Sequence, residues 1–184
     1  SDYLVRFASK YPDIHFDIHE GSTFALKNEL ENGLVDITTL RTPIVLNECN
    51  TSVLLQENLV AMAIPGFFDI RYTNISLKEL SQKSLILSHR YRKYIISAFE
   101  DNGLTCDIYC ECEDARTAIT LAEHGLGVAI LPSSMRELNP CLYAYSIKDT
   151  NLSTEILLAW RDDRIPVEVE KFLSEVTCSH HLNP

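Results

Sequence analysis

Several features that identify common classes of protein are missing from this sequence of 184 residues. Basic residues are few, since the chain has 16 lysines and arginines but 26 aspartates and glutamates. We therefore do not expect a basic face that binds the phosphate backbone of a nucleic acid. No apolar run approaches the roughly 20 residues of a membrane span. Residues 1–10 lack the apolar centre of a signal peptide. We therefore expect a cytoplasmic protein with no membrane partner.

The six cysteines lack the spacing of a metal site. Without an export signal, reduced thiols are the default. Cys106, Cys110 and Cys112 share parity, so in a strand their side chains would point to one face. We interpret them as small buried hydrophobic residues, with a redox or metal role as the open alternative. No metal and no cofactor are predicted.

Strand and helix patterns alternate along the chain, which predicts an α/β fold with largely parallel sheets. Residues 2–12 have helical apolar spacing that stops at Pro12, and the period-two alternation of 14–19 predicts a half-buried strand. The apolar stretch 53–65 has no turn signal in its middle, which favours two strands in series that cross between lobes. Further helices are expected over 24–32, 76–80, 91–102, 114–124 and 167–176, and further strands over 34–40, 84–88, 106–112, 128–131, 142–147 and 155–160.

Two stretches repeat one order of elements. LKNELENGLVDITTLRTP (26–43) and AITLAEHGLGVAILPSS (118–134) both read as amphipathic helix, glycine, apolar strand and proline. Gly33 and Gly125 stand at equivalent points, where a left-handed residue ends a helix. This repetition is typical of two lobes with similar topology. Ligands of open α/β sheets bind at the carboxyl ends of the strands, so we expect a small-molecule site between the lobes.

Four motifs carry a resemblance to a known family: FASKYPDIHFDIHEGST, LENGLVDITTLRTP, LVAMAIP and AEHGLGVAILP. In this order and spacing they resemble the effector-binding domains of LysR-type transcriptional regulators, from Tyr3 to about Val176. The resemblance implies a type 2 periplasmic-binding-protein-like α/β fold, with two Rossmann-like lobes joined by two crossing strands. Lobe I would comprise 1–56 with 157–184, and lobe II 57–156. The effector would lie in the cleft between them, with no catalysis.

Two parts of the family pattern are absent from the sequence. One is the N-terminal winged helix-turn-helix with its linker helix, so DNA would be contacted only through that missing domain. The other is the first strand of lobe I with its Ser/Thr-bearing loop. The resemblance also implies a homodimer, which becomes a tetramer in the full-length protein. The helix at 3–9 and the strand at 14–18 are the expected edges of the dimer.

The resemblance also implies a ligand site made of residues that follow the ends of strands. Its members are Ser22, Thr23 and Arg41 from lobe I, and Ser88, His89, Arg90, Glu113 and Asp114 from lobe II. Helix N-termini favour an anion, and a guanidinium forks onto a carboxylate, so we expect a small organic acid.

Each of these residues has an ordinary structural role as its alternative. Ser22 and Thr23 can cap a helix, and Arg41 can form a salt bridge. The stretch containing His89 and Arg90 can be the solvated start of a helix. Glu113 and Asp114 favour capping over contact with an anion, because like charges repel.

The predicted function is therefore that of a sensor domain of a bacterial LysR-type regulator, which controls transcription. A solute-binding protein of the same fold is one alternative, but it would carry an export signal and avoid six thiols. An enzyme on this scaffold, a dehydratase or deaminase, is the other. It requires a nucleophile–base pair or a metal set. His15, His89 and His124 are scattered, and Ser133 and Ser134 have no histidine partner, so no enzyme activity is predicted.

Overall fold

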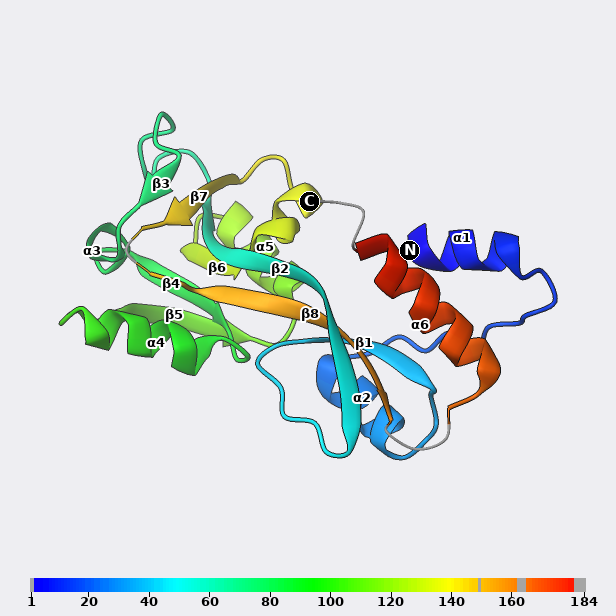
Figure 1. Cartoon of the computed structure of the whole chain (residues 1–184). Coiled ribbons are helices and arrows are strands. Elements are labelled where there is room, and N and C mark those ends of the chain that lie inside the picture. The colour runs from blue at the N-terminus through cyan, green and yellow to red at the C-terminus, as the bar shows by residue number, and fades with distance from the viewer. Residues whose placement is uncertain (1, 149, 162–164, 181–184) are drawn as a thin grey trace. The chain divides into compact units, whose positions relative to one another are not determined.

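The computed structural model describes residues 2–148, 150–161 and 165–180. The chain divides into two compact units: unit 1 with residues 1–55 and 155–184, and unit 2 with residues 56–154. Strands β2 (Cys49–Ala63) and β8 (Ser153–Arg161) run through the two boundaries and connect the units (Figure 1). No helix of the described ranges is both long enough and apolar enough to cross a membrane.

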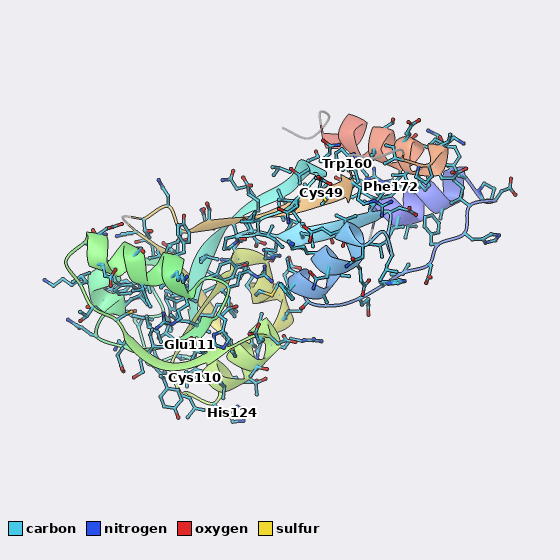
Figure 2. All side chains as sticks on the ribbon, turned by 90° about the horizontal axis from the view of Figure 1, so that it is seen from below. Cys49, Cys110, Glu111, His124, Trp160 and Phe172 are labelled. Carbon is cyan, nitrogen blue, oxygen red and sulfur yellow. The ribbon has the colours of Figure 1, made fainter. Side chains whose placement is uncertain are left out.

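The described part of unit 1 contains three helices and a small antiparallel ladder. The helices are α1 (Asp2–Lys10), α2 (Thr23–Glu31) and α6 (Val167–His180), and the strand β1 (Ile37–Arg41) pairs with β8. Helices α1 and α6 lie side by side (Figure 1), and Figure 2 shows Phe172 on α6. The ring of Phe172 lies 5.2 Å from that of Phe7 on α1. A second cluster buries Leu30, Leu40 and Ala159 between α2 and the ladder.

The strand predicted over 14–19 does not form, and residues 14–20 run without regular secondary structure. Alternating apolar residues form a strand only where a neighbouring strand offers a hydrogen-bonding ladder. Within the described ranges, no strand pairs with this segment. Phe16 and Ile18 are accordingly 41% and 67% exposed, where a half-buried strand was expected.

Unit 2 is built on a sheet with the strand order β2-β6-β4-β5, to which β7 and the short β3 are added. Its elements are β3 (Asn74–Ile75), α3 (Leu77–Leu80), β4 (Ser84–Ser88), α4 (Arg92–Asp101), β5 (Asp107–Cys112), α5 (Ala115–Glu123), β6 (Val128–Pro132), the 3-10 helix η1 (Ser133–Leu138) and β7 (Tyr143–Ile147). Strand β4 is parallel to β5 and β6, whereas β2 is antiparallel to β6 and β7. The sheet is therefore mixed rather than largely parallel, because the crossing strand enters against the direction of its neighbours.

The long apolar stretch forms one strand, β2, rather than two strands in series. The strand is 15 residues long, and its last part pairs with both β6 and β7. Residues 59–63 are buried, whereas most of the earlier residues are exposed or half-buried. A strand that passes from one unit to the next can change partners without a turn, so no break is needed.

Two apolar clusters cover the two faces of the unit 2 sheet. On the α4 side, Leu85 and Leu87 of β4 pack with Ile95 and Phe99 of the helix. On the α5 side, Ile86 of β4 packs with residues of the second helix, Ala118 and Ala122 among them. The alternation of consecutive β4 residues between the two sides is the expected period of a strand.

A β-bulge interrupts this alternation in β5. Between Ile108 and Cys110 the strand advances two residues while β4 advances one, so Tyr109 is the extra residue. Cys106 and Ile108 consequently pack on the α4 side, whereas Cys110 and Cys112 pack on the α5 side. The expectation that the three cysteines share one face is therefore wrong, because a bulge shifts the side-chain period by one residue.

Candidate functional site

The predicted residues of unit 1 lie around the start of α2 and the end of β1. Ser22 is the N-cap of α2, because its Oγ accepts a 3.2 Å hydrogen bond from the backbone N–H of Ala25. Thr23 is the first helical residue and Arg41 the last residue of β1, and both are half-buried. The chain reverses between α2 and β1, and the two elements are in contact, so Thr23 and Arg41 stand at the same end of the unit. The capping alternative holds for Ser22.

The predicted residues of unit 2 lie at the carboxyl edge of β4 and β5. Ser88 ends β4 and is buried, and His89 and Arg90 form the turn into α4. Glu113 and Asp114 form the turn from β5 into α5. Because the two strands are parallel and adjacent, their ends meet at one edge of the sheet. The structure thus brings these five residues to one place.

Sequence reasoning missed Glu111 on β5, which binds His89 and Arg92 at this edge. Its Oε2 lies 3.0 Å from Nδ1 of His89, and its Oε1 accepts a 2.6 Å hydrogen bond from Nε of Arg92. The hydrogen bond from Arg92 holds the pKa of the Glu111 carboxyl below its usual range. The sequence did hold a signal for this pairing. Glu111 stands one position before the end of a predicted strand, and the basic stretch SHRYR (88–92) follows the strand that precedes it in the chain.

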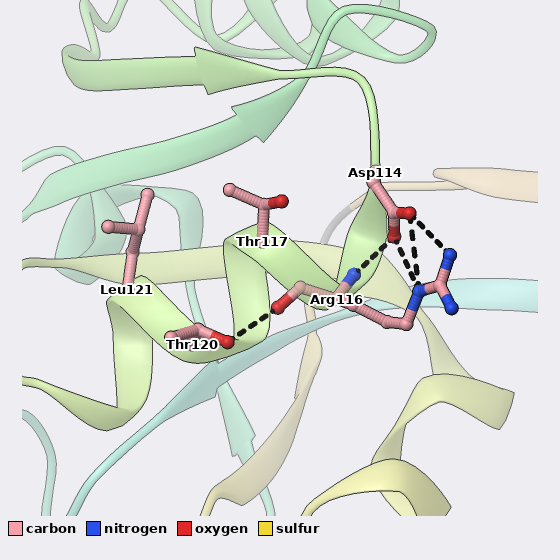
Figure 3. Close-up of a pocket in the computed structure, with 5 residues that line it drawn as sticks. All are labelled: Asp114, Arg116, Thr117, Thr120 and Leu121. Atoms are coloured by element: carbon pink, nitrogen blue, oxygen red, sulfur yellow. Dashed lines mark hydrogen bonds and ion pairs between the residues drawn. The ribbon is translucent and has the colours of Figure 1, made fainter.

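Asp114 caps the N-terminus of α5, which was the structural alternative to ligand contact for this residue. Its Oδ1 accepts a 2.8 Å hydrogen bond from the backbone N–H of Arg116, and Oδ2 lies 2.7 Å from the Nη2 of the same residue (Figure 3). The hydrogen bonds from the Arg116 side chain keep the pKa of the Asp114 carboxyl below its usual range. The negative charge at the start of α5 is therefore already compensated. Glu113 is exposed.

A pocket of about 340 Å³ follows α5 from Asp114 onward. It is lined by Asp114, Arg116, Thr117, Thr120 and Leu121 (Figure 3). The hydroxyl of Thr120 donates to the backbone carbonyl of Arg116 at 3.0 Å, so it is used within the helix. Of the lining residues only Asp114 was predicted. The guanidinium and hydroxyl groups suit a polar small molecule, and they include no nucleophile–base pair.

The described cysteines are all free thiols. Burial raises the pKa of the Cys106 and Cys112 thiols, which favours the less reactive protonated form. In the part of the chain that the structure describes, no group of three or more histidine, cysteine, aspartate or glutamate side chains is placed to hold a metal ion.

Comparison with known protein sequences identifies relatives along nearly the whole chain. The family model described as the LysR substrate binding domain matches residues 1–179. The HTH-type transcriptional regulator YnfL of Escherichia coli (strain K12) is 28% identical over 167 residues, which cover 87% of this chain and 56% of that protein. CatR of Pseudomonas putida is 23% identical over 93% of this chain and 61% of its own length. The chain thus spans somewhat more than half the length of these two regulators.

Solved structures share the fold. The effector-binding domain of QuiR in complex with shikimate superposes with a TM-score of 0.86 at 19% identity, covering 99% of this chain and 90% of that one. The BenM effector-binding domain with its effector benzoate gives 0.82 at 17% identity, over 98% and 85% of the two chains. Full-length CbnR with its target DNA gives 0.80 at 20% identity, over 96% and 62%. These likenesses confirm the predicted fold, and with the match over residues 1–179 they show that the chain belongs to the family of LysR substrate-binding domains, the effector-binding part of LysR-type transcriptional regulators.

Proposed function

We propose that this domain binds a small organic acid and thereby controls transcription by the regulator to which it belongs. The contacts are the side chains at the strand ends of each unit, with Thr23 and Arg41 in unit 1 and His89 in unit 2. Arg41 is the observation that carries the proposal, because this half-buried arginine ends β1 and its guanidinium is suited to fork onto a carboxylate. The effectors of two structural neighbours, shikimate and benzoate, support this class of ligand.

The kind of basic residue at the unit 2 edge supports this choice of ligand. His89, Arg90 and Arg92 stand within four residues at the carboxyl edge of β4, beside the acidic Glu111, Glu113 and Asp114. The preference for an anion therefore rests on the forked donors of the arginines, and not on a local excess of positive charge. Residues Ser88 and Arg90 are proposed contacts as well, while Ser22, Glu113 and Asp114 border the site through their roles at helix starts.

We also propose that the domain is not an enzyme and that it works in the bacterial cytoplasm, where a regulator meets DNA. The curated relatives are transcriptional regulators, which supports both points. Contact with DNA is assigned to the winged helix-turn-helix domain of the family, outside this chain. One structural neighbour, full-length CbnR, was solved in complex with its target DNA, which supports a role on DNA for the full-length regulator.

The domain is further proposed to form a homodimer, and a tetramer in the full-length regulator. Unit 1 offers apolar side chains on α1 and on the extended segment that follows it. Val5 is 65% exposed and Ile18 67% exposed, although both are aliphatic. Exposed aliphatic side chains grouped on neighbouring segments favour contact with a partner.

A thermal-shift screen tests the proposed ligand class. Organic acids, neutral sugars and amines are compared at matched ionic strength. A one-site ligand at a hundred times its dissociation constant stabilises the native state by about 2.7 kcal/mol, which a melting curve detects readily. We expect stabilisation by one or more acids. Stabilisation by sugars or amines alone, or by no compound, would overturn the proposal.

A further inference from the structure

We infer that Glu111 is a positioning residue of the effector site, and that the two groups it holds, the imidazole of His89 and the guanidinium of Arg92, anchor an acidic group of the effector in unit 2. The inference rests on the proposed function and deepens it. Arg92 joins His89 as a residue that binds the acidic group of the effector. Glu111, although acidic, favours the binding of this anion because it holds the two basic side chains in place.

The contacts of Glu111 fix both partners at once. One carboxylate oxygen lies 3.0 Å from Nδ1 of His89, and the other accepts a 2.6 Å bond from Nε of Arg92. The backbone N–H of His89 also donates to the carbonyl oxygen of Cys112 at 3.1 Å. Both the ring and its backbone are therefore tied to β5. A carboxylate that binds one nitrogen of a histidine orients the ring and sets the direction of the other nitrogen.

The β-bulge at Tyr109 directs Glu111 toward these partners. Ile108 faces the α4 side and Cys110 the α5 side, so Glu111 returns to the α4 side, where α4 begins at Arg92. Figure 2 shows Cys110 and Glu111 as neighbours on β5. A regular strand would place Glu111 opposite Ile108, on the α5 side, away from Arg92. Bulges commonly redirect a side chain in this way next to functional sites.

The outer atoms of the two basic side chains have no partner among the described residues. These atoms are Nε2 of His89 and the terminal amines of Arg92, whose side chains are 48% and 43% exposed. Glu111 itself is less exposed, at 26%. Glu111 is thus the most buried of the three side chains. The terminal amines of Arg92, and Nε2 of His89 when both ring nitrogens carry a proton, can donate to a carboxylate from solution. An arginine whose Nε is occupied still offers its two terminal amines.

A simpler role for Glu111 makes the opposite prediction. If the carboxylate only competed with anions, its removal would delete a like charge and strengthen the binding of an anion. If it positions the two donors, its removal releases both side chains and weakens binding. The sign of the change in affinity therefore separates the two roles.

The experiment follows the side-chain NMR signals of His89 and Arg92 while the full chain is titrated with benzoate at constant ionic strength. Benzoate is the probe because it presents a single carboxylate. We expect saturable shifts of the His89 ring nitrogens and the Arg92 Nε–H in the wild-type protein. Glu111→Ala should raise the apparent dissociation constant at least tenfold, and Glu111→Gln should do so to a smaller degree, because its amide oxygen accepts from only one side. Glu100→Gln, the same loss of charge on α4, should change nothing.

Three results would overturn the inference. They are no saturable shift in the wild-type protein, unchanged affinity in both Glu111 variants, and tighter binding in either one. The ring nitrogen shifts of ligand-free His89 provide a second readout, because loss of the carboxylate removes the partner of Nδ1 and should move its resonance, which a purely structural effect elsewhere would not. If Glu111→Ala does not fold, Glu111→Gln decides. If acids still bind through Arg41 while Glu111 has no effect, only this inference fails; if no acid binds the protein, the proposed function fails.

Discussion

The backbone N–H of Ser134 donates a 2.7 Å hydrogen bond to Oε2 of Glu57, a carboxylate that is only 7% exposed. The hydroxyls of Ser133 and Ser134 lie 3.3 and 3.2 Å from the same carboxylate. Glu57 stands on β2, and the two serines begin η1. A buried acidic group thus joins the crossing strand to the turn that follows β6, and it satisfies the donors at the start of the 3-10 helix.

Glu57→Ala is therefore expected to destabilise the protein by about 1–3 kcal/mol, because it leaves the half-buried donors of Ser133 and Ser134 without their acceptor. Urea unfolding at pH 7 measures the effect. Glu137→Ala removes an exposed carboxylate from η1 itself and should change stability by less than about 0.5 kcal/mol. Equal effects of the two variants would contradict this role of Glu57.

Gly127→Ala is expected to cost about 1–3 kcal/mol through overpacking. A Cβ at this position would lie 2.7 Å from the backbone oxygen of Ser84 and 3.2 Å from Cγ1 of Ile86. Gly21→Ala is the matched control, because its Cβ would meet Ala25 at an ordinary 3.5 Å. Thermal and urea unfolding of both variants provide the comparison. A Gly127→Ala protein as stable as the wild type would show that β4 and β6 are not packed this closely.

The Asp114 carboxylate is expected to stabilise the protein only above acidic pH. Its pKa is lowered in the native state by hydrogen bonds from Arg116, so its contribution is complete above the unfolded value of about 3.9 and is lost as pH falls through the lower native value. Asp114→Asn keeps the helix cap but not the charge. The wild type should be the more stable protein at pH 7, and the difference should shrink toward pH 2. A difference that is constant with pH would contradict the charge effect.

Ile18→Asp tests the proposed dimer, since it places a charge on the exposed segment of unit 1. Analytical ultracentrifugation should find the wild-type domain as a dimer and the variant as a monomer. Ile70→Asp makes the same change at a side chain in unit 2 that is 55% exposed, and it should remain dimeric. A wild-type monomer at high concentration, or a monomer for both variants, would contradict the proposed surface.

Repeated local patterns were the most predictable part of the fold. Gly33 and Gly125 end α2 and α5 with φ angles of 71° and 73°, and the residue after each donates to a carbonyl five residues earlier. These left-handed ends need glycine, so they can be recognised in the sequence. The family resemblance was equally informative, because it rested on several motifs in register.

Features that depend on neighbouring strands could not be predicted. The alternation of Ile14, Phe16 and Ile18 resembles that of a strand, yet no described strand pairs with the segment. No characteristic residue type marks the bulge at Tyr109 in the sequence. The bulge nevertheless determines on which side of the sheet the side chains of Cys110 and Glu111 lie. Glu111 was missed for the same reason, since its contacts follow from a register that the sequence does not display.

Calorimetric titration of the most stabilising organic acid into the wild-type domain and its Arg41→Gln variant tests whether Arg41 binds the carboxylate of the ligand. We expect one saturable site in the wild type, and binding at least tenfold weaker in the variant, because a charged forked contact is lost. Arg136→Gln, on the exposed side of η1, should bind like the wild type. An acid that binds Arg41→Gln as tightly as the wild type, or the absence of any acid that binds, would contradict the account.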